Sequence, residues 1–199
     1  MGTLDFIKSL LFICFWVPFL FMNVWSETHW EDIQMLKQFK DSIDSNSIRN
    51  ISCLSSWDFS VDPCDNLFGE KFTCGIRCDV VLGSISRVTE LGLEEASYSG
   101  SLSSVDWNLP YLETLDLTGN YVYGWVPDSF SNLTRLKKLR VSGNSLTGSI
   151  PESLGFISGL EELSLDNNFL VGIVPLALNG LNNLKRLELL REQAQWLVS

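Results

Sequence analysis

Four cysteines are the residues whose type and spacing most clearly imply chemistry. They lie within 26 residues of one another, at Cys53, Cys64, Cys74 and Cys78. An even, clustered set of cysteines behind a secretory leader is typical of disulfides formed in an oxidising compartment. Spacings of 11, 10 and 4 residues do not form the two close ligand pairs of a zinc site. We therefore predict two disulfides, and the residues leave all three possible connectivities open.

The other side chains that could support catalysis do not form a known constellation. The sequence holds a single histidine, His29, and lacks a nucleophile elbow, a phosphate-binding loop and the kinase motifs. Carboxylate pairs such as Glu94 and Glu95 are typical of solvated surface. We expect no enzymatic activity, no metal and no cofactor, and we expect His29 to be solvated rather than a ligand.

Net charge and the N-terminal segment define the class of protein. The 199 residues include 14 Lys and Arg against 24 Asp and Glu, so the net charge is −10. Such a field repels polyanions and excludes nucleic acid as a partner. Residues 1–26 contain an apolar run of 13 residues, shorter than the ~20 residues that span a bilayer. We predict a signal peptide, entry into the secretory pathway, and an extracellular or cell-surface location with no other membrane anchor.

The strongest pattern is a repeat with a period of 24 residues. The stretch Leu139–Leu154 returns 24 residues upstream and 24 residues downstream. Each copy has Leu-x-Leu, which is typical of a short strand with one buried face, followed by an asparagine, a glycine and a proline. This period and this leucine pattern predict a leucine-rich-repeat solenoid. The asparagine and glycine positions are Asn120, Asn144 and Asn168, and Gly124, Gly148 and Gly172.

The fold class predicted is an α/β solenoid, a right-handed superhelix with a parallel β-sheet on its concave face. Each buried asparagine amide is expected to bond the turning backbone of neighbouring coils, and each glycine to permit close backbone approach. We assign residues 27–87 to an N-terminal helical, disulfide-bonded cap and residues 88–189 to four full repeats and one partial repeat. Residues 190–199 do not continue the pattern, and we interpret them either as an improvised lid or as the mark of a truncated receptor.

Within the cap, residues 28–41 predict a helix. Thr28 and Glu31 have the spacing of a capping box, in which each side chain satisfies a backbone N–H of the first turn. Apolar residues then follow at three- and four-residue steps and predict one buried stripe. The stripe consists of Trp30, Ile33, Leu36, Phe39 and Ile43.

The motifs after this helix resemble a known family. Ser56-Trp57, Asp62-Pro63-Cys64 and the run Cys74-Gly-Ile-Arg-Cys78-Asp lead into the repeats. This order resembles the N-terminal cap of plant leucine-rich-repeat receptor proteins, and Leu-x-Gly-x-Ile-Pro resembles their repeats. In that family the cysteines of the Pro-Cys and Cys-Asp motifs pair, which implies Cys64 with Cys78 and leaves Cys53 with Cys74. Cys74 stands where the family usually has tryptophan.

The resemblance implies a non-enzymatic extracellular module that recognises a protein or peptide. It would be the ectodomain of a receptor-like protein or a truncated form of one, and a co-receptor kinase ectodomain is among the partners implied. The alternative is a secreted inhibitor of a cell-wall-degrading enzyme, similar to the plant polygalacturonase inhibitors. Those inhibitors share the cap and the repeat type but carry more repeats.

Two surfaces of the predicted solenoid are candidates for partner binding. On the concave sheet, opposite charges on adjacent strands either contact a partner or neutralise one another as a ladder. On the flank, clustered exposed aromatics are typical of interface anchors. The candidates are Asp116, Lys138, Arg140, Glu162 and Arg186 on the concave sheet, and Tyr121, Tyr123, Trp125 and Phe169 on the flank. Asn50-Ile-Ser and Asn132-Leu-Thr predict N-glycosylation.

Overall fold

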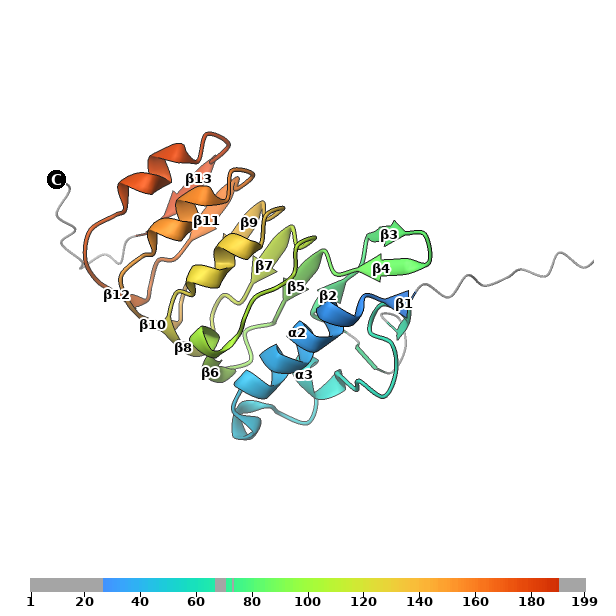
Figure 1. Cartoon of the computed structure of the whole chain (residues 1–199). Helices are drawn as coiled ribbons and strands as arrows, with labels where there is room; N and C mark the ends of the chain where they lie inside the picture. The colour runs from blue at the N-terminus through green and yellow to red at the C-terminus, as the bar shows by residue number, and fades with distance from the viewer. Residues whose placement is uncertain (1–26, 67–70, 73, 190–199) are drawn as a thin grey trace, which may run out of the picture.

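A computed structural model describes residues 27–66, 71–72 and 74–189, which form a curved stack of coils behind an N-terminal cap (Figure 1). The predicted signal peptide and tail lie outside the described residues. The largest sheet has six strands in the order β13-β11-β9-β7-β5-β2. Its strands are β2 (Ile76–Arg77), β5 (Glu90–Gly92), β7 (Thr114–Asp116), β9 (Lys138–Arg140), β11 (Glu162–Ser164) and β13 (Arg186–Glu188).

The register of this sheet follows the 24-residue repeat. Leu115 of β7 lies opposite Leu91 of β5 and Leu139 of β9, and all neighbouring strands from β5 to β13 are parallel. Only β2, which the cap contributes, pairs antiparallel with β5. These three leucines are fully buried, because the alternation of a strand turns every second side chain to one face. The predicted leucine-rich-repeat solenoid is confirmed.

A second sheet runs along the flank of the stack in the order β12-β10-β8-β6, and its strands are parallel. They are β6 (Ser99–Ser101), β8 (Tyr121–Trp125), β10 (Ser145–Gly148) and β12 (Phe169–Leu170). Pro127, Pro151 and Pro175 then start short 3-10 helices, since their fixed φ and missing N–H suit that position. These helices are η4 (Asp128–Asn132), η5 (Glu152–Phe156) and η6 (Leu176–Gly180), preceded in the first coil by η3 (Leu102–Ser104).

The buried asparagines connect consecutive coils. Asn144 donates through Nδ2 to the carbonyl of Leu117 in the preceding coil at 2.9 Å and to that of Val141 in its own coil at 3.1 Å. Its Oδ1 accepts from the backbone N–H of Val122 at 3.0 Å. Asn168 repeats this set one coil later. The amide therefore satisfies backbone groups that the turning chain leaves without partners.

The repeated glycines hold a backbone conformation that other residues rarely adopt. Gly124, Gly148 and Gly172 have φ values of +95°, +79° and +94°, so the flank strands bend at these points without strain. Gly100 serves a different purpose, because a Cβ there would lie 2.4 Å from the carbonyl oxygen of Ser42 at the end of the cap helix. The glycine thus lets the cap approach the first coil.

The cap helix, α2 (Trp30–Ser42), starts one residue later than the capping box predicted. Its N-cap is His29, whose Nδ1 accepts from the backbone N–H of Glu31 at 3.4 Å. Thr28 lies instead in β1 (Glu27–Thr28) and donates to the Asp62 carboxylate from its backbone N at 2.7 Å and from Oγ1 at 2.5 Å. The predicted capping box is therefore wrong, because the Thr28 hydroxyl bonds the Asp62 carboxylate and does not cap the helix.

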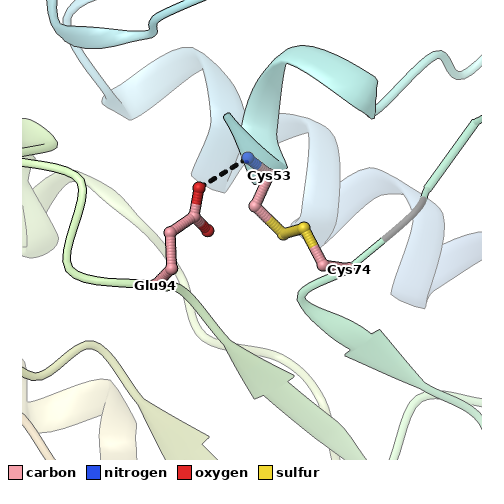
Figure 2. Close-up of side chains that lie close together, drawn as sticks. All are labelled: Cys53, Cys74 and Glu94. Atoms are coloured by element: carbon pink, nitrogen blue, oxygen red, sulfur yellow. Dashed lines mark hydrogen bonds between the residues drawn. A yellow bond between two sulfur atoms is a disulfide. The ribbon is translucent and has the colours of Figure 1, made fainter. Parts of the chain in front are cut away.

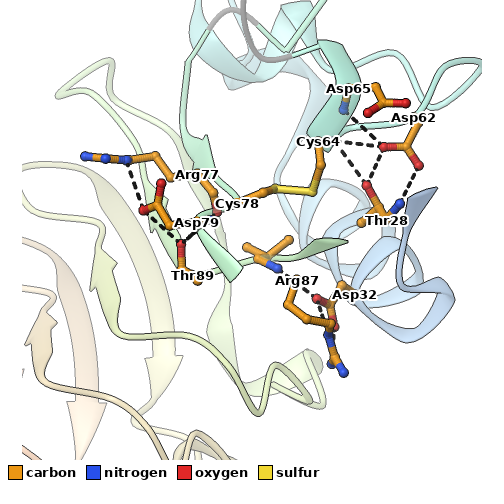
Figure 3. Close-up of a disulfide and its surroundings, with 11 residues drawn as sticks. Thr28, Asp32, Asp62, Cys64, Asp65, Arg77, Cys78, Asp79, Arg87 and Thr89 are labelled. Atoms are coloured by element: carbon orange, nitrogen blue, oxygen red, sulfur yellow. Dashed lines mark hydrogen bonds and ion pairs between the residues drawn. A yellow bond between two sulfur atoms is a disulfide. The ribbon is translucent and has the colours of Figure 1, made fainter. Parts of the chain in front are cut away.

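The buried face of α2 also differs from the predicted stripe. Phe39 is fully buried, but Trp30 is 65% exposed, and the carboxylate of Asp32 is buried instead. Arg87 donates to this carboxylate through Nη2 at 2.7 Å and Nε at 3.0 Å (Figure 3). The stripe prediction is wrong for Trp30, and the buried face instead includes Asp32, whose carboxylate is satisfied by the charged hydrogen bonds from Arg87.

Two disulfides close the cap with the pairing that the resemblance implied. Cys53 bonds Cys74 (Figure 2), and Cys64 bonds Cys78 (Figure 3). The remaining cap elements lie around them: β4 pairs with β1 on one side and β3 on the other. These elements are η1 (Ser45–Ser47), α3 (Cys53–Ser56), η2 (Cys64–Asn66), β3 (Val80–Leu82) and β4 (Ile85–Arg87). No helix within the described ranges is both long enough and apolar enough to cross a membrane.

Candidate binding surfaces

The concave sheet places its charged candidates in the two columns that the sequence predicted. Lys138 lies opposite Glu162, and Glu162 lies opposite Arg186 on the next strand. In the second column Asp116 lies opposite Arg140. Because neighbouring strands lie ~4.8 Å apart, each of these side chains falls within reach of charged residues on the adjacent strands.

Arg140 is the centre of this charged group. It donates to both carboxylate oxygens of Glu162, through Nε at 2.9 Å and Nη2 at 2.7 Å, and to Asp116 through Nη1 at 3.2 Å. The hydrogen bonds with Glu162 raise the pKa of Arg140, and the same bonds hold the pKa of Glu162 below its usual range. This part of the face forms the self-neutralising ladder that the sequence offered as an alternative to partner contact.

Two of the predicted cations of the concave face remain accessible. Lys138 is exposed, and the Arg186 side chain is 63% exposed with only long contacts, 3.7 Å to Glu162 and 4.0 Å to Glu188. Exposed ion pairs of this kind contribute little to stability. The structure therefore separates the predicted set into Asp116, Arg140 and Glu162, which satisfy one another, and these two, which a partner could reach.

The flank sheet carries the predicted aromatics on its outer surface. Tyr121, Tyr123 and Trp125 of β8 are 61%, 50% and 60% exposed, and Phe169 of β12 is 54% exposed. Thr147 of β10 lies opposite both Trp125 and Phe169. We call this surface the flank face and define it by the outward residues of β6, β8, β10 and β12. These residues are Ser99, Ser101, Tyr121, Tyr123, Trp125, Ser145, Thr147 and Phe169.

A further row of ion pairs, which sequence reasoning missed, lies just before the concave strands. Lys137 Nζ contacts Glu113 Oε2 at 2.6 Å, and Lys185 Nζ contacts Glu161 Oε2 at 2.7 Å. The residues of each pair are 24 apart, so charge of opposite sign at one repeat position was the available signal. These pairs cross-link neighbouring coils at the surface.

A cleft of about 350 Å³ lies between α2 and the loop of residues 106–108, away from both candidate surfaces. Gln38 and Asp106 join its two walls by a pair of hydrogen bonds, each 3.2 Å long. These two residues are 68 apart in sequence, and no local pattern connects them. The cleft is lined by Trp30, Glu31, Gln34, Met35, Gln38, Asp106 and Asn108.

Among the described residues, one group of side chains has atom types that could bind a metal, but its contacts are structural. The ligand atoms of Cys53, Cys74 and Glu94 lie within 4.8 Å of one another (Figure 2), but the two sulfur atoms are bonded to each other. Oε1 of Glu94 accepts from the backbone N–H of Cys53 at 2.7 Å and from the hydroxyl of Tyr98 at 2.8 Å. Burial raises the pKa of Tyr98, which keeps it a donor. The cluster thus ties the cap to the first coil.

Both predicted glycosylation sites are exposed. Asn50 precedes α3, and Asn132 ends η4. Their modification stays a prediction.

Comparison with known proteins identifies both parts of the chain. The family described as Leucine rich repeat N-terminal domain matches residues 29–79. The Leucine Rich Repeat family matches residues 111–133, 135–157 and 159–181. These ranges cover the cap and three consecutive coils.

Relatives and solved structures agree with these matches. A probable leucine-rich repeat receptor-like serine/threonine-protein kinase of Arabidopsis thaliana is 35% identical over 99 residues, which are 44% of this chain and 10% of the kinase. A chain of the BIR3–SERK2 complex from Arabidopsis thaliana is 32% identical with a TM-score of 0.66, and the match covers 80% of each chain. A chain of the PEPR1–AtPEP1 structure is 28% identical with a TM-score of 0.64 and covers 77% of this chain and 20% of that one.

The matched kinase therefore shares only about a tenth of its length with this chain. The family matches lie in the cap and the repeats, and the matching chain of the BIR3–SERK2 complex covers 80% of this chain. The chain belongs to the plant leucine-rich-repeat receptor-like ectodomains, with their N-terminal domain and their repeats.

Proposed function

We propose that this chain is an extracellular, non-enzymatic recognition module that binds a protein or peptide, with another leucine-rich-repeat ectodomain as its main partner class. The observation that carries this proposal is the likeness to a chain of a complex between two proteins, at 32% identity and a TM-score of 0.66. The chain and a member of the BIR3–SERK2 complex cover 80% of each other, whereas the chain covers 20% of the PEPR1 structure. The BIR3–SERK2 structure is a complex of two proteins, which supports a protein partner for this chain.

The dimensions of the concave face support a protein partner that extends beyond it. Five strands at ~4.8 Å spacing make a face about 24 Å wide, and three residues per strand give a length of about 10 Å and an area of about 240 Å². A standard interface buries ~800 Å² on each partner. The partner would therefore contact a neighbouring surface in addition to Lys138 and Arg186, two accessible cations of the concave face.

Secretion and a cell-surface location follow from the same proposal. Two disulfides persist in an oxidising compartment and not in the cytosol. The relatives of matching fold are plant receptor ectodomains. Expression of the full chain in plant cells should place the mature protein in the medium or the cell wall.

The binding proposal is tested with the full chain after secretion, immobilised for interferometry against purified SERK2 ectodomain and a panel of other leucine-rich-repeat ectodomains. We expect at least one to bind. The double variant Lys138→Glu, Arg186→Glu should weaken this binding at least tenfold, because exposed charges at an interface steer the encounter with the partner. Arg49→Glu, which reverses an exposed cap charge, is the matched control and should leave affinity unchanged.

Two outcomes would contradict the proposal. Binding to none of the ectodomains, with binding to a pectin-degrading polygalacturonase instead, would favour the inhibitor hypothesis. Equal effects of the concave double variant and the Arg49 control would remove the concave face from the interface.

A further inference from the structure

We propose that the flank face is a second binding surface, and that its ligand is an uncharged, extended glycan chain of the β-glucan type. The flank face and this ligand class both differ from those proposed for the concave face. The four flank strands carry aromatic rings and hydroxyl groups in an arrangement that suits a sugar chain.

The aromatic residues stand in a row along one strand. Tyr121, Tyr123 and Trp125 alternate with buried or small residues of β8, so all three side chains lie on the outer surface. Residues two apart on a strand are separated by about 6.6 Å. The ring carbons of a pyranose carry C–H groups that form an apolar face, and aromatic rings with one apolar body and a polar tip pack well against such a face.

Hydroxyl-bearing strands flank this row on both sides. Ser99 and Ser101 of β6 lie opposite Tyr121 and Tyr123, and Ser145 of β10 lies opposite Tyr123 from the other side. Each hydroxyl can donate one hydrogen bond and accept two, which matches the hydroxyl groups at the edges of a sugar ring. The surface therefore offers stacking along its centre and hydrogen bonding at its borders.

The absence of charged side chains on the flank strands favours an uncharged ligand. None of the residues of β6, β8, β10 and β12 carries a charged side chain, although the whole chain has a net charge of −10. A polyanionic glycan would be repelled by the overall field, and a basic peptide would find no carboxylate on these strands. A neutral polysaccharide is neither repelled by the overall field nor dependent on a carboxylate for binding.

The flank face is small enough for a short glycan chain to cover it. Four strands at ~4.8 Å, with two to five residues each, give at most about 320 Å². A protein or a second copy, which needs ~800 Å² on each side, would also have to contact surface beyond these four strands. A glycan a few sugars long covers the smaller area completely, and its extended shape follows the row of rings.

The test uses the secreted full chain and two neutral probes. Hydroxyethyl cellulose in a native gel should retard the protein, and cellohexaose should give binding heat in calorimetry. Trp125→Ala should weaken both signals at least tenfold. Trp30→Ala is the matched control, because Trp30 is 65% exposed and Trp125 60%, yet Trp30 lies on the cap helix. Both variants should unfold near the wild-type temperature.

Three results would overturn the inference. One is the absence of retardation and of heat with both neutral probes. A second is an equal loss in the Trp30 control. A third is a dimer in sedimentation that Trp125→Ala dissociates, which would assign the flank face to a second copy. Binding of SERK2 or related ectodomains is measured separately, so failure here leaves the proposed function standing and testable.

Discussion

At the scale of single residues, Asn144 should contribute more to stability than any exposed polar side chain. It bonds Leu117, Val122 and Val141, which belong to three segments of two neighbouring coils. Asn144→Leu would leave these buried backbone groups unsatisfied, and each such group costs about 1–3 kcal/mol. We expect the free energy of unfolding, measured by urea titration, to fall by about 3 kcal/mol or more.

The matched control for this prediction is Asn182→Leu. Asn182 is exposed and lies at the end of the next coil, so the same change should alter the free energy of unfolding by about 0.5 kcal/mol or less. Equal losses in the two variants would show that the asparagine column does not hold the coils together.

The contact between Arg140 and Glu162 predicts a pH dependence. The folded-state pKa of Glu162 lies below its unfolded value, so its contribution is present above the unfolded pKa and is lost as pH falls through the folded pKa. Arg140→Met should therefore lower Tm at pH 7 but much less near pH 3. Lys138 and Arg186 also face Glu162 and retain part of the effect.

The size of this effect is limited by solvent, since the Arg140 side chain is 32% exposed. At pH 7 we expect about 1 kcal/mol or less, read from thermal unfolding between pH 3 and pH 7. Arg49→Met, an exposed arginine in the cap, is the control and should show a Tm difference that does not vary with pH. A constant difference for Arg140→Met would contradict the prediction.

At the scale of elements, the joint between α2 and the first coil depends on one buried ion pair. The carboxylate of Asp32 accepts two hydrogen bonds from Arg87 and one from the backbone N–H of Val88 at 2.9 Å (Figure 3). Asp32→Ala should cost about 3–5 kcal/mol, because it leaves the arginine buried and unpaired. Urea unfolding would measure this loss.

The double variant Asp32→Leu, Arg87→Met separates the charge from the packing. Apolar side chains of similar volume should restore most of the stability lost in Asp32→Ala. A double variant as unstable as the single one would mean that the hydrogen bond to Val88, rather than the ion pair, holds the joint.

Sequence and structure agree best where an element repeats. Three copies of one pattern predict the concave strands and the bonding of Asn144 from the sequence alone. They disagree in the cap, where each element occurs once. No local pattern indicates that Asp62 takes the hydroxyl of Thr28, or that Asp32 rather than Trp30 is buried, because both depend on a partner far along the chain. On the flank face, periodicity predicted the exposure of Tyr121, because alternation along one strand is a local pattern.

At the scale of the whole molecule, a solenoid is stabilised mainly by contacts between neighbouring coils. The leucine column at the centre of the concave strands shows what this means along the stack. Leu91, Leu115, Leu139 and Leu163 are fully buried, whereas Leu187 of β13 is 47% exposed. The same residue type at the same repeat position therefore has two different environments, and its contribution should depend on which coil it occupies.

Leu139→Ala and Leu187→Ala make this dependence measurable. Removing a fully buried leucine side chain costs about 2–5 kcal/mol through lost burial and a cavity between packed coils. At Leu187 the deleted atoms are half exposed, so the loss should be about 1 kcal/mol or less. Hydrogen exchange gives a second measurement, since Leu139→Ala should speed exchange in β7, β9 and β11, while Leu187→Ala should affect β13 and leave β7 unchanged. Equal losses, or faster exchange throughout the stack in both variants, would show that the coils unfold as one unit rather than through contacts with their neighbours.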